Sequence, residues 1–429
     1  MTISELHKIF EQSACGRIST DTRAIEADSL FFAWKWGEQD GNAYAAEALV
    51  KGASYVVIDN SEYHKIEDSR YILVKDSIQT LQELAAYHRG QYGIPVVAVA
   101  GSNGKTTTKE LIGAVLETEL GVVASKGSHN NHVGVPKTLL KINSETEIAV
   151  IEMGTNHPGE IAPLCRIANP THGLITNIGR DHIGFFGSEE AIADENLELY
   201  KYLSQYGGQI FIPENETLLQ DDVYTKDALM YGAELTSLET QPYLSVQWKN
   251  NDIQTKFVGE YNRQNIAAAI AVGWFFGVNE KNIVKGIENY LPDNNRSELH
   301  IGDNGSMIVK DFYNANKNSM QLAIQSFEKI IIDDPQKKSL AVLGDMFELG
   351  EFALQDHQAI VDSAEQSSAD EIILVGEDFG RCTLVRAKHY MNTVEAIASM
   401  QSMNFSNTKI LMKASNGMNF QKIFDEFFK

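Results

Sequence analysis

One stretch of the chain, VVAVAGSNGKTTTKEL at residues 96–111, limits the possible fold more than any other. Its first half is a run of β-branched and small apolar residues, which predicts a buried strand that ends at Gly101. The segment from Lys105 to about Leu120 has a helical pattern and stops at Gly121. A strand, a glycine turn and a helix in this order are the context that a phosphate-binding loop requires. We therefore expect a parallel α/β sheet with this loop at its edge.

The residues of the turn have the chemistry that a nucleoside triphosphate requires. Gly101 and Gly104 let the backbone approach closely, so that amide N–H groups can hold phosphate oxygens. We expect Lys105 to neutralise the β- and γ-phosphates, and the Thr106 hydroxyl to coordinate Mg²⁺. The full Walker A pattern requires a glycine where Val99 stands, so this is a shortened GxxGKT loop, and a glycine cap before an ordinary basic helix is the alternative. The residues predicted to bind ATP here are Gly101, Ser102, Asn103, Gly104, Lys105, Thr106 and Thr107.

Strand-like and helix-like segments alternate along the rest of the chain. A helical pattern ends near Gly93, just before Pro95, and the runs EIAVIEMG and HGLITNIG that follow are typical of buried parallel strands. A segment rich in turn formers, 289–300, precedes four further apolar runs that alternate with helices. The sequence predicts an α/β protein of three domains: a first domain at 1–93, a central P-loop-type domain with a parallel sheet at 94–295, and a C-terminal Rossmann-like domain at 296–429.

Composition excludes several classes of function. Lys and Arg number 36 against 58 Asp and Glu, and the resulting net charge of −22 repels nucleic-acid phosphates and anionic membranes. No window approaches the 18 consecutive apolar residues of a membrane span, and the N-terminal segment lacks a signal-peptide pattern. The three cysteines, Cys15, Cys165 and Cys382, are far apart and show no metal-ligand spacing. We expect a cytoplasmic protein without disulfides that binds neither nucleic acid nor membrane.

Seven motifs distributed along the chain point to a known family: AGSNGKTTTKEL, IEMGTNHPGEI, NNHVGVPKTLL, GEYNRQNIAAAI, NNRSE, DFYNANKNSM and LGDMFELGE. Taken in their order along the chain, they resemble the Mur ligase family, over essentially the whole chain. The last two are typical of the branch that adds D-alanyl-D-alanine to UDP-N-acetylmuramoyl-tripeptide in peptidoglycan biosynthesis. The resemblance implies a ligase that uses ATP and Mg²⁺: ATP phosphorylates a substrate carboxylate, an amine attacks the acyl phosphate, and an amide, ADP and phosphate are released. We expect a monomer that acts on these two small-molecule substrates.

The resemblance also assigns the metal side of the site. Glu152 ends the IAVIE run, at the sheet edge where ligand groups gather, and His182 follows NIGRD. By resemblance both coordinate magnesium with Thr106, and Lys105, Glu152 and His182 form the catalytic set. From the residues alone, a solvated glutamate at a strand end and an ordinary polar histidine are the alternatives.

Three residues from two domains are expected to contact ATP. Asn265 stands near the start of a predicted helix, Arg296 in the hinge and Asp311 after IVK. By resemblance they meet the nucleotide, since Arg suits bidentate phosphate contacts and Asp accepts from hydroxyls. The alternatives are a helix cap for Asn265 and a linker salt bridge between Arg296 and Asp311. Because the contacts come from two domains, we expect domain closure around ATP.

The substrate contacts implied by the resemblance lie in short polar motifs that would otherwise be interpreted as turns. STDTR in the first domain resembles a uridine-diphosphate site, and NNHVGVPKT resembles the loop that holds the muramoyl part. The polar turn after IVKD supplies further candidates. The predicted substrate-binding residues are Thr22, Arg23, Asn130, Asn131, Tyr313, Asn314 and Asn316.

The chain departs from the family pattern at four places. Asn196 stands where the family has a lysine that is carbamylated by CO₂ and supports a second magnesium, and asparagine cannot be carbamylated. Gly184 replaces a usual glutamate, and the segments 33–41 and 413–418 differ from their usual forms, with Asn416 where an arginine is usual. These departures leave two alternatives open: a paralogue that joins another carboxylate and amine, or a nucleotide-binding partner that does not catalyse.

Overall fold

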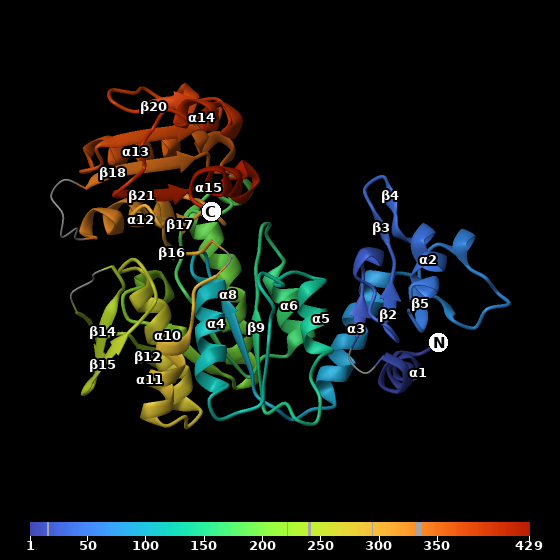
Figure 1. The fold of residues 1–429 in the computed structure, drawn as a ribbon. Coiled ribbons are helices and arrows are strands. Elements are labelled where there is room, and N and C mark those ends of the chain that lie inside the picture. Colours follow the sequence, from blue (N-terminus) through green and yellow to red (C-terminus); the bar gives the residue numbers. More distant parts are fainter. Residues whose placement is uncertain (15–16, 221, 239–241, 294, 331–336) are drawn as a thin grey trace.

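The computed structural model describes residues 1–429 except 15–16, 221, 239–241, 294 and 331–336, so that Cys15 lies outside the described residues. Figure 1 shows three units that follow one another along the chain, coloured blue, cyan to yellow, and orange to red. The C-terminal unit lies on the central one, and the first unit stands at the side of the central one. Each unit has helices packed on a largely parallel sheet, which confirms the predicted α/β class. Among the described residues, no helix is long and apolar enough to cross a membrane.

The first unit contains a four-stranded sheet in the order β1-β2-β5-β6, with every neighbouring pair parallel. Its strands are short, and all three residues of β2 are buried. The long helix that leads out of this unit is capped by Asp76, whose carboxylate accepts from the backbone N–H of Gln79 at 2.8 Å. The elements are α1 (Ile3–Ile9), β1 (Ile18–Ser19), β2 (Leu30–Phe32), β3 (Lys35–Trp36), β4 (Gln39–Asp40), α2 (Ala45–Val50), β5 (Tyr55–Ile58), β6 (Tyr71–Leu73) and α3 (Ser77–Gly90).

The central unit contains a six-stranded sheet in the order β12-β11-β10-β7-β9-β8, parallel throughout. Both faces are covered: Val97 and Val99 of β7 pack with α4 and α10, whereas Val96 and Ala98 belong to the core formed with α6 and α8. Burial on both faces explains why the sequence shows continuous apolar runs here. The elements are β7 (Val96–Ala100), α4 (Lys105–Leu116), β8 (Val122–Ala124), α5 (Gly134–Leu139), β9 (Ile148–Glu152), α6 (Ile161–Ala168), β10 (His172–Ile175), α7 (Ile183–Phe186), α8 (Glu189–Tyr206), β11 (Gln209–Pro213), α9 (Asp222–Thr225), β12 (Leu229–Tyr231), α10 (Asn262–Phe275) and α11 (Glu280–Asn289).

Two features of this unit differ from the sequence prediction. An antiparallel sheet of β13 (Leu235–Ser237), β14 (Ser245–Trp248) and β15 (Asn251–Gln254) follows β12 and was not predicted. Helix α4 ends at Leu116 rather than near Leu120, because the Thr118 hydroxyl donates to the Val115 carbonyl at 2.6 Å and competes with the helical pattern.

The C-terminal unit contains a six-stranded sheet in the order β16-β17-β21-β18-β19-β20, in which only the edge pair β16–β17 is antiparallel. The strands expected from the four apolar runs are all present. The elements are β16 (Glu298–Ile301), β17 (Met307–Asp311), α12 (Lys317–Lys329), β18 (Lys338–Gly344), α13 (Ala353–Gln366), β19 (Glu371–Val375), β20 (Lys388–Tyr390), α14 (Thr393–Met400), β21 (Thr408–Lys413) and α15 (Gln421–Phe427).

The strand order of the central sheet places the phosphate loop at a switch point. From β7 the chain builds β8 and β9 on one side and β10, β11 and β12 on the other. The carboxyl ends of β7, β9 and β10 therefore meet in one crevice, where ligands bind in open α/β sheets. The C-terminal unit lies over this edge (Figure 1).

Candidate active site between the central and C-terminal units

The phosphate loop joins β7 to α4 through two glycines with positive φ. Gly101 has φ +118° and Gly104, the residue before α4, has φ +80°. The first backbone hydrogen bond of α4 is donated by Thr108 to the Gly104 carbonyl at 2.8 Å. The N–H groups of residues 104–107 therefore precede the helical ladder, in the position where helices bind anions. The Lys105 ammonium is folded over the same loop and donates to the Gly101 and Ser102 carbonyls at 2.5 and 2.8 Å.

The end of β10 holds the loop in this conformation. Asn177 accepts from the backbone N–H groups of Ser102, at 2.9 Å, and of Asn103, at 3.0 Å. The Thr176 hydroxyl donates to the Asn103 carbonyl at 2.7 Å. Sequence reasoning missed Thr176 and Asn177, although both stand directly after a predicted strand, as Glu152 does. The loop is therefore shaped before any ligand binds.

Glu152, at the carboxyl end of β9, lies beside the first turn of α4. Its Oε1 accepts from the Thr106 hydroxyl at 3.1 Å and from the Asn130 amide at 2.8 Å. Its buried Oε2 has no hydrogen-bond partner among the described residues, and the residue is only 1% exposed. A buried carboxylate oxygen without a partner is costly unless a cation balances it. Glu152 and the Thr106 hydroxyl are oxygen donors of the kind that Mg²⁺ prefers, so these residues fit the ion that the family resemblance implies.

Asp181 was not predicted as a site residue, yet it lies beside the loop. It is 5% exposed, and its Oδ2 lies 3.8 Å from the Lys105 ammonium. Its buried Oδ1 has no hydrogen-bond partner in the part of the chain that the structure describes. The signal that could have found it is its position next to His182 in the same motif. His182 has φ +53° and turns its ring to Glu348, in the loop that follows β18. His182 thus joins the central unit to the C-terminal unit.

Further polar contacts connect these two units around the phosphate loop. The Asn316 amide donates to the Asn103 side chain at 2.8 Å, and the Tyr313 and Ser128 hydroxyls are 2.5 Å apart. Between the units lies a cavity of about 840 Å³. The predicted residues that line it are Ser102, Asn103, Gly104, Lys105, Thr106, Thr107, Asn130, Glu152, His182, Asn265, Arg296, Asp311, Tyr313 and Asn314. Most of the predicted site is thus brought together in one place.

Arg296 and Asp311 both line this cavity but do not pair with each other. Asp311 accepts from the Lys413 ammonium at 2.7 Å. Arg296 stacks on the Tyr313 ring, with its guanidinium carbon 3.7 Å from the ring centroid. Its buried Nε has no hydrogen-bond partner within the described residues. The alternative of a linker salt bridge between Arg296 and Asp311 is therefore wrong. A stacked guanidinium with an unused donor is suited to an anionic or planar ligand.

Asn265 approaches the loop from α10. Its Oδ1 accepts from the Thr108 hydroxyl at 3.0 Å, and its Nδ2 donates to Asn262 at 3.0 Å. A Cβ on Gly104 would lie 2.6 Å from Asn265 Oδ1, so the pair fits only because Gly104 has no side chain. Asn265 lies inside α10, whose N-cap is Tyr261, so the alternative of a helix cap is wrong as well.

Thr22, Arg23 and Asn131 lie outside the lining of the cavity. The exposed Arg23 guanidinium donates to Asp21, and the hydrogen bonds hold the pKa of that carboxyl down at about 2. Asn131 accepts from the backbone N–H of Val133 and shapes the turn before α5. Lys137 of α5 reaches the segment of the first unit that contains Thr22 and Arg23, where its ammonium lies 3.5 Å from the Thr20 hydroxyl. Burial, with repulsion by nearby Lys141, lowers the pKa of Lys137.

Two of the departures from the family pattern also lie at this interface. Asn416 lines the cavity, beside Lys413 at the end of β21. Gly184 packs directly on the turn after β18: its N–H donates to the Glu348 carbonyl at 3.0 Å, and a Cβ would lie 2.5 Å from the Gly350 nitrogen. Trp36, in the 33–41 segment, is 68% exposed at a hairpin of the first unit.

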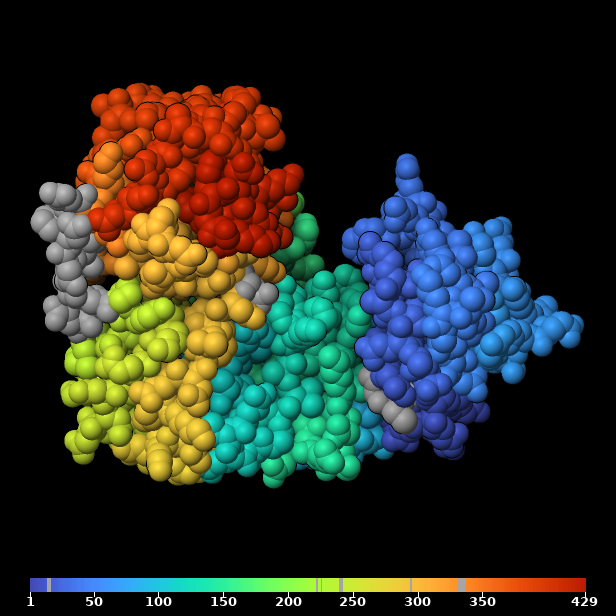
Figure 2. Space-filling model, in the orientation of Figure 1, coloured from blue at the N-terminus to red at the C-terminus, as the bar shows by residue number. Residues whose placement is uncertain are grey.

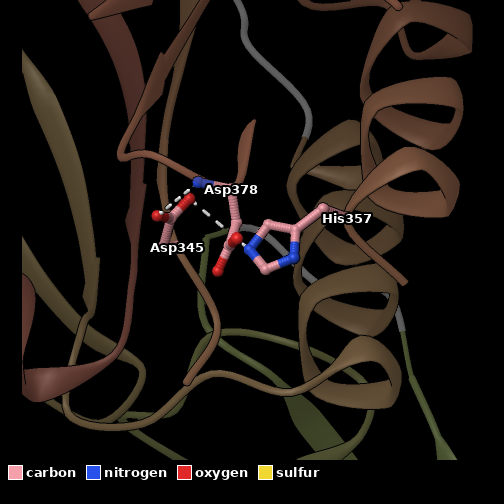
Figure 3. A group of neighbouring side chains, drawn as sticks. All are labelled: Asp345, His357 and Asp378. Atoms are coloured by element: carbon pink, nitrogen blue, oxygen red, sulfur yellow. Dashed lines mark hydrogen bonds and ion pairs between the residues drawn. The ribbon is translucent and has the colours of Figure 1, made fainter. Parts of the chain in front are cut away.

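A second cluster of acidic and imidazole groups lies inside the C-terminal unit, where Asp345, His357 and Asp378 converge (Figure 3). Asp345 accepts from the backbone N–H groups of Asp378 and Phe379, both at 3.0 Å. Burial acts to raise the pKa of Asp345, but the hydrogen bonds, including that of His357, outweigh it and lower the pKa. The ring of His357 also has backbone partners, at Met346 and Ala353. This cluster therefore ties β18 to its neighbouring loops and needs no metal to balance it.

Comparison with known proteins agrees with this geometry. Residues 99–273 match the Mur ligase middle domain, and 295–415 match the domain described as Mur ligase, glutamate ligase domain. The UDP-N-acetylmuramoyl-tripeptide–D-alanyl-D-alanine ligase of Bacillus subtilis (strain 168) is 34% identical, over 96% of this chain and 93% of that protein. A crystal structure of MurF from Acinetobacter baumannii is 27% identical with a TM-score of 0.82, covering 99% of this chain and 98% of that one. The MurF ligase of Thermotoga maritima in complex with ADP has the same fold, with a TM-score of 0.81 at 23% identity over 96% of each chain.

Proposed function

The chain belongs to the Mur ligase family, and we propose that it joins D-alanyl-D-alanine to UDP-N-acetylmuramoyl-tripeptide at the expense of ATP, in peptidoglycan biosynthesis. The observation that carries the proposal is the single cavity in which the phosphate loop, the buried Glu152 and the polar groups of the C-terminal unit meet. The similarity to the Bacillus subtilis ligase extends over 96% of this chain and 93% of that protein. Figure 2 shows open space between the first and the C-terminal units, from which substrates could approach.

The phosphate loop would hold the triphosphate. The N–H groups of residues 104–107 bind its oxygens, and Lys105 leaves the Gly101 and Ser102 carbonyls to meet the transferring phosphoryl group. Thr106 and Glu152, with His182 at the rim, would hold Mg²⁺, which neutralises phosphate charge when bound. Asp181, whose Oδ2 lies 3.8 Å from the Lys105 ammonium, would help to orient that side chain.

The remaining residues would fix ATP and the amine relative to each other. Asn265 supports the turn at Gly104, and Arg296 and Asp311 approach the nucleotide from the hinge and from the C-terminal unit. Tyr313 and Asn314 face the same cavity, while Asn316 acts by tethering the loop at Asn103. The protein supplies no nucleophile in this scheme; positioning and charge neutralisation account for the catalysis.

The first unit would bind the uridine-diphosphate end of the substrate. Thr22 and Arg23 lie outside the cavity lining, so we propose that they contact only the distal end of the substrate, and that Asn130 and Asn131 flank the muramoyl part. We assign domain boundaries at 93/94 and 295/296, and propose that the chain acts as a monomer in the cytoplasm.

Phosphate release by the purified chain tests the proposal. With Mg·ATP, release should require both UDP-N-acetylmuramoyl-tripeptide and D-alanyl-D-alanine, and the product should gain the mass of the dipeptide less one water. Replacing either substrate by a chemically similar compound shows whether the altered 413–418 segment has changed the substrate specificity. Release that needs neither substrate, or that occurs only with a different amine, would contradict the assignment.

A further inference from the structure

Asn196 of α8 lies inside the protein, directly behind the phosphate loop. It is 1% exposed. Its Oδ1 accepts from the backbone N–H of Gly101 at 2.8 Å, and its Nδ2 donates to the Ile192 carbonyl, one helical turn earlier, at 2.8 Å. Both ends of the amide are therefore used, as burial of a polar side chain requires. The neutral amide of Asn196 therefore matches the hydrogen-bonding groups around it.

Gly101, the partner of Asn196, is the residue at which β7 turns into the loop. On one side it is held by Asn196, and on the other a Cβ would lie 2.8 Å from the Thr176 backbone nitrogen. Its carbonyl accepts from the Lys105 ammonium at 2.5 Å. A hydrogen bond to the N–H of Gly101 thus fixes the peptide that leads into the phosphate-binding turn. Movement of that peptide would displace the loop and the lysine together.

The carboxylates near Asn196 do not supply the charge that a second dication would require. Glu195 is buried, and its two oxygens accept from the backbone N–H groups of residues 159–161 at 2.6 to 2.9 Å, where they cap α6. Glu198 pairs with Lys201 at 2.7 Å, and Asp194 is exposed. Because Mg²⁺ prefers charged oxygen donors, these residues do not fit the second magnesium that the family resemblance implies at this position.

We propose that Asn196 is a positioning residue for the phosphate loop, and that its neutral hydrogen bond to Gly101 replaces a carbamylated lysine, so that the site works with one Mg²⁺ and independently of CO₂. The CO₂ independence rests on the proposed ligase function. The positioning of the loop requires only that the loop binds ATP.

The first experiment compares Asn196→Ala with Thr255→Val. Thr255 is 2% exposed, and its hydroxyl donates to the Leu244 carbonyl at 2.6 Å and accepts from the Phe257 N–H at 3.2 Å, in the antiparallel part of the central unit. Each variant thus loses two buried hydrogen bonds. Thermal unfolding is measured first, to check that both variants fold. We expect Asn196→Ala to weaken Mg·ATP binding about 10-fold by titration calorimetry, and Thr255→Val to leave it unchanged. Equal affinities in the two variants would overturn the positioning role.

The second experiment measures the ligase rate of the wild-type chain in CO₂-depleted buffer and in buffer with added bicarbonate. Equal rates are expected, and a rate that falls several-fold without CO₂ would overturn the second half of the proposal. A chain that is inactive in both buffers would contradict the proposed function instead. In that case ATP affinity still decides the role of Asn196, because the calorimetric comparison needs no turnover.

Discussion

Replacing Gly184 by alanine should disturb the contact between the two units that form the cavity. An added Cβ would lie 2.5 Å from the Gly350 nitrogen, 2.7 Å from the Glu348 carbonyl oxygen and 2.8 Å from the Leu349 carbonyl carbon. All three are backbone atoms, so no side chain can rotate away, and the turn must retreat by about 1 Å to restore ordinary contact. This retreat lengthens the 3.0 Å hydrogen bond from the Gly184 N–H to Glu348. Overpacking and a weakened hydrogen bond together cost about 2 kcal/mol.

If the reaction requires this arrangement of the two units, kcat/KM should decrease about 30-fold. Steady-state kinetics of Gly184→Ala measures the decrease, and calorimetry should show that ATP affinity changes much less, because the loop itself is untouched. Gly90→Ala is the matched control, since a Cβ there meets nothing within 4 Å. A Gly184→Ala enzyme with wild-type kcat/KM would refute the argument that this contact belongs to the catalytic conformation.

Three further perturbations follow from buried charged and titratable groups. Glu152→Gln should lower the ligase rate at least about 100-fold and weaken Mn²⁺ binding, followed by metal titration, because the remaining neutral amide is a poor ligand; an unchanged rate would exclude Glu152 from the site. Burial lowers the pKa of His172 to about 4, so the folded state resists its protonation. The contribution of His172 to the free energy of unfolding should be complete above pH 6.5 and should decrease by about 2 kcal/mol as the pH falls towards 4, as measured by chemical unfolding. The pH dependence should be weaker in His172→Phe, and an equally steep dependence in that variant would contradict this assignment. Asp356→Ala should destabilise the chain by about 3 kcal/mol in the same assay, because Arg180 and Lys317, at 3.1 and 3.4 Å, lose the fully buried carboxylate they share; a loss below 1 kcal/mol would argue against a buried charge pair.

The parts of the site that could be predicted from sequence are those encoded by consecutive residues. The phosphate loop needs only a strand, two glycines and a helix, all within residues 96–111, and the structure places them as expected. Glu152 could be predicted for a similar reason, because the carboxyl end of a buried strand marks the ligand edge of a parallel sheet. Thr176 and Asn177 obey the same rule and were missed, since a polar residue after a strand is too common to single out. Asp181 lies further along the chain from β10, and only its position next to His182 could have indicated it.

The parts that could not be predicted depend on contacts between distant segments. From the sequence, Asn196 could be recognised only as the loss of a lysine, whereas its partner Gly101 lies far away along the chain. Gly184 could be interpreted as drift, but the structure shows a turn of the other unit packed against it. The antiparallel sheet β13–β15 consists of strands of three or four residues, too short for a reliable periodic pattern.

The most direct test of the account follows the oxygen atoms of the tripeptide carboxylate. The central claim is that the cavity joins the γ-phosphate of ATP to that carboxylate before the amine attacks. UDP-N-acetylmuramoyl-tripeptide labelled with ¹⁸O in its terminal carboxylate is incubated with Mg·ATP, D-alanyl-D-alanine and the purified chain, and the released phosphate is analysed by mass spectrometry. The account predicts one ¹⁸O atom from the carboxylate in each phosphate released. Formation of the amide with unlabelled phosphate would contradict it.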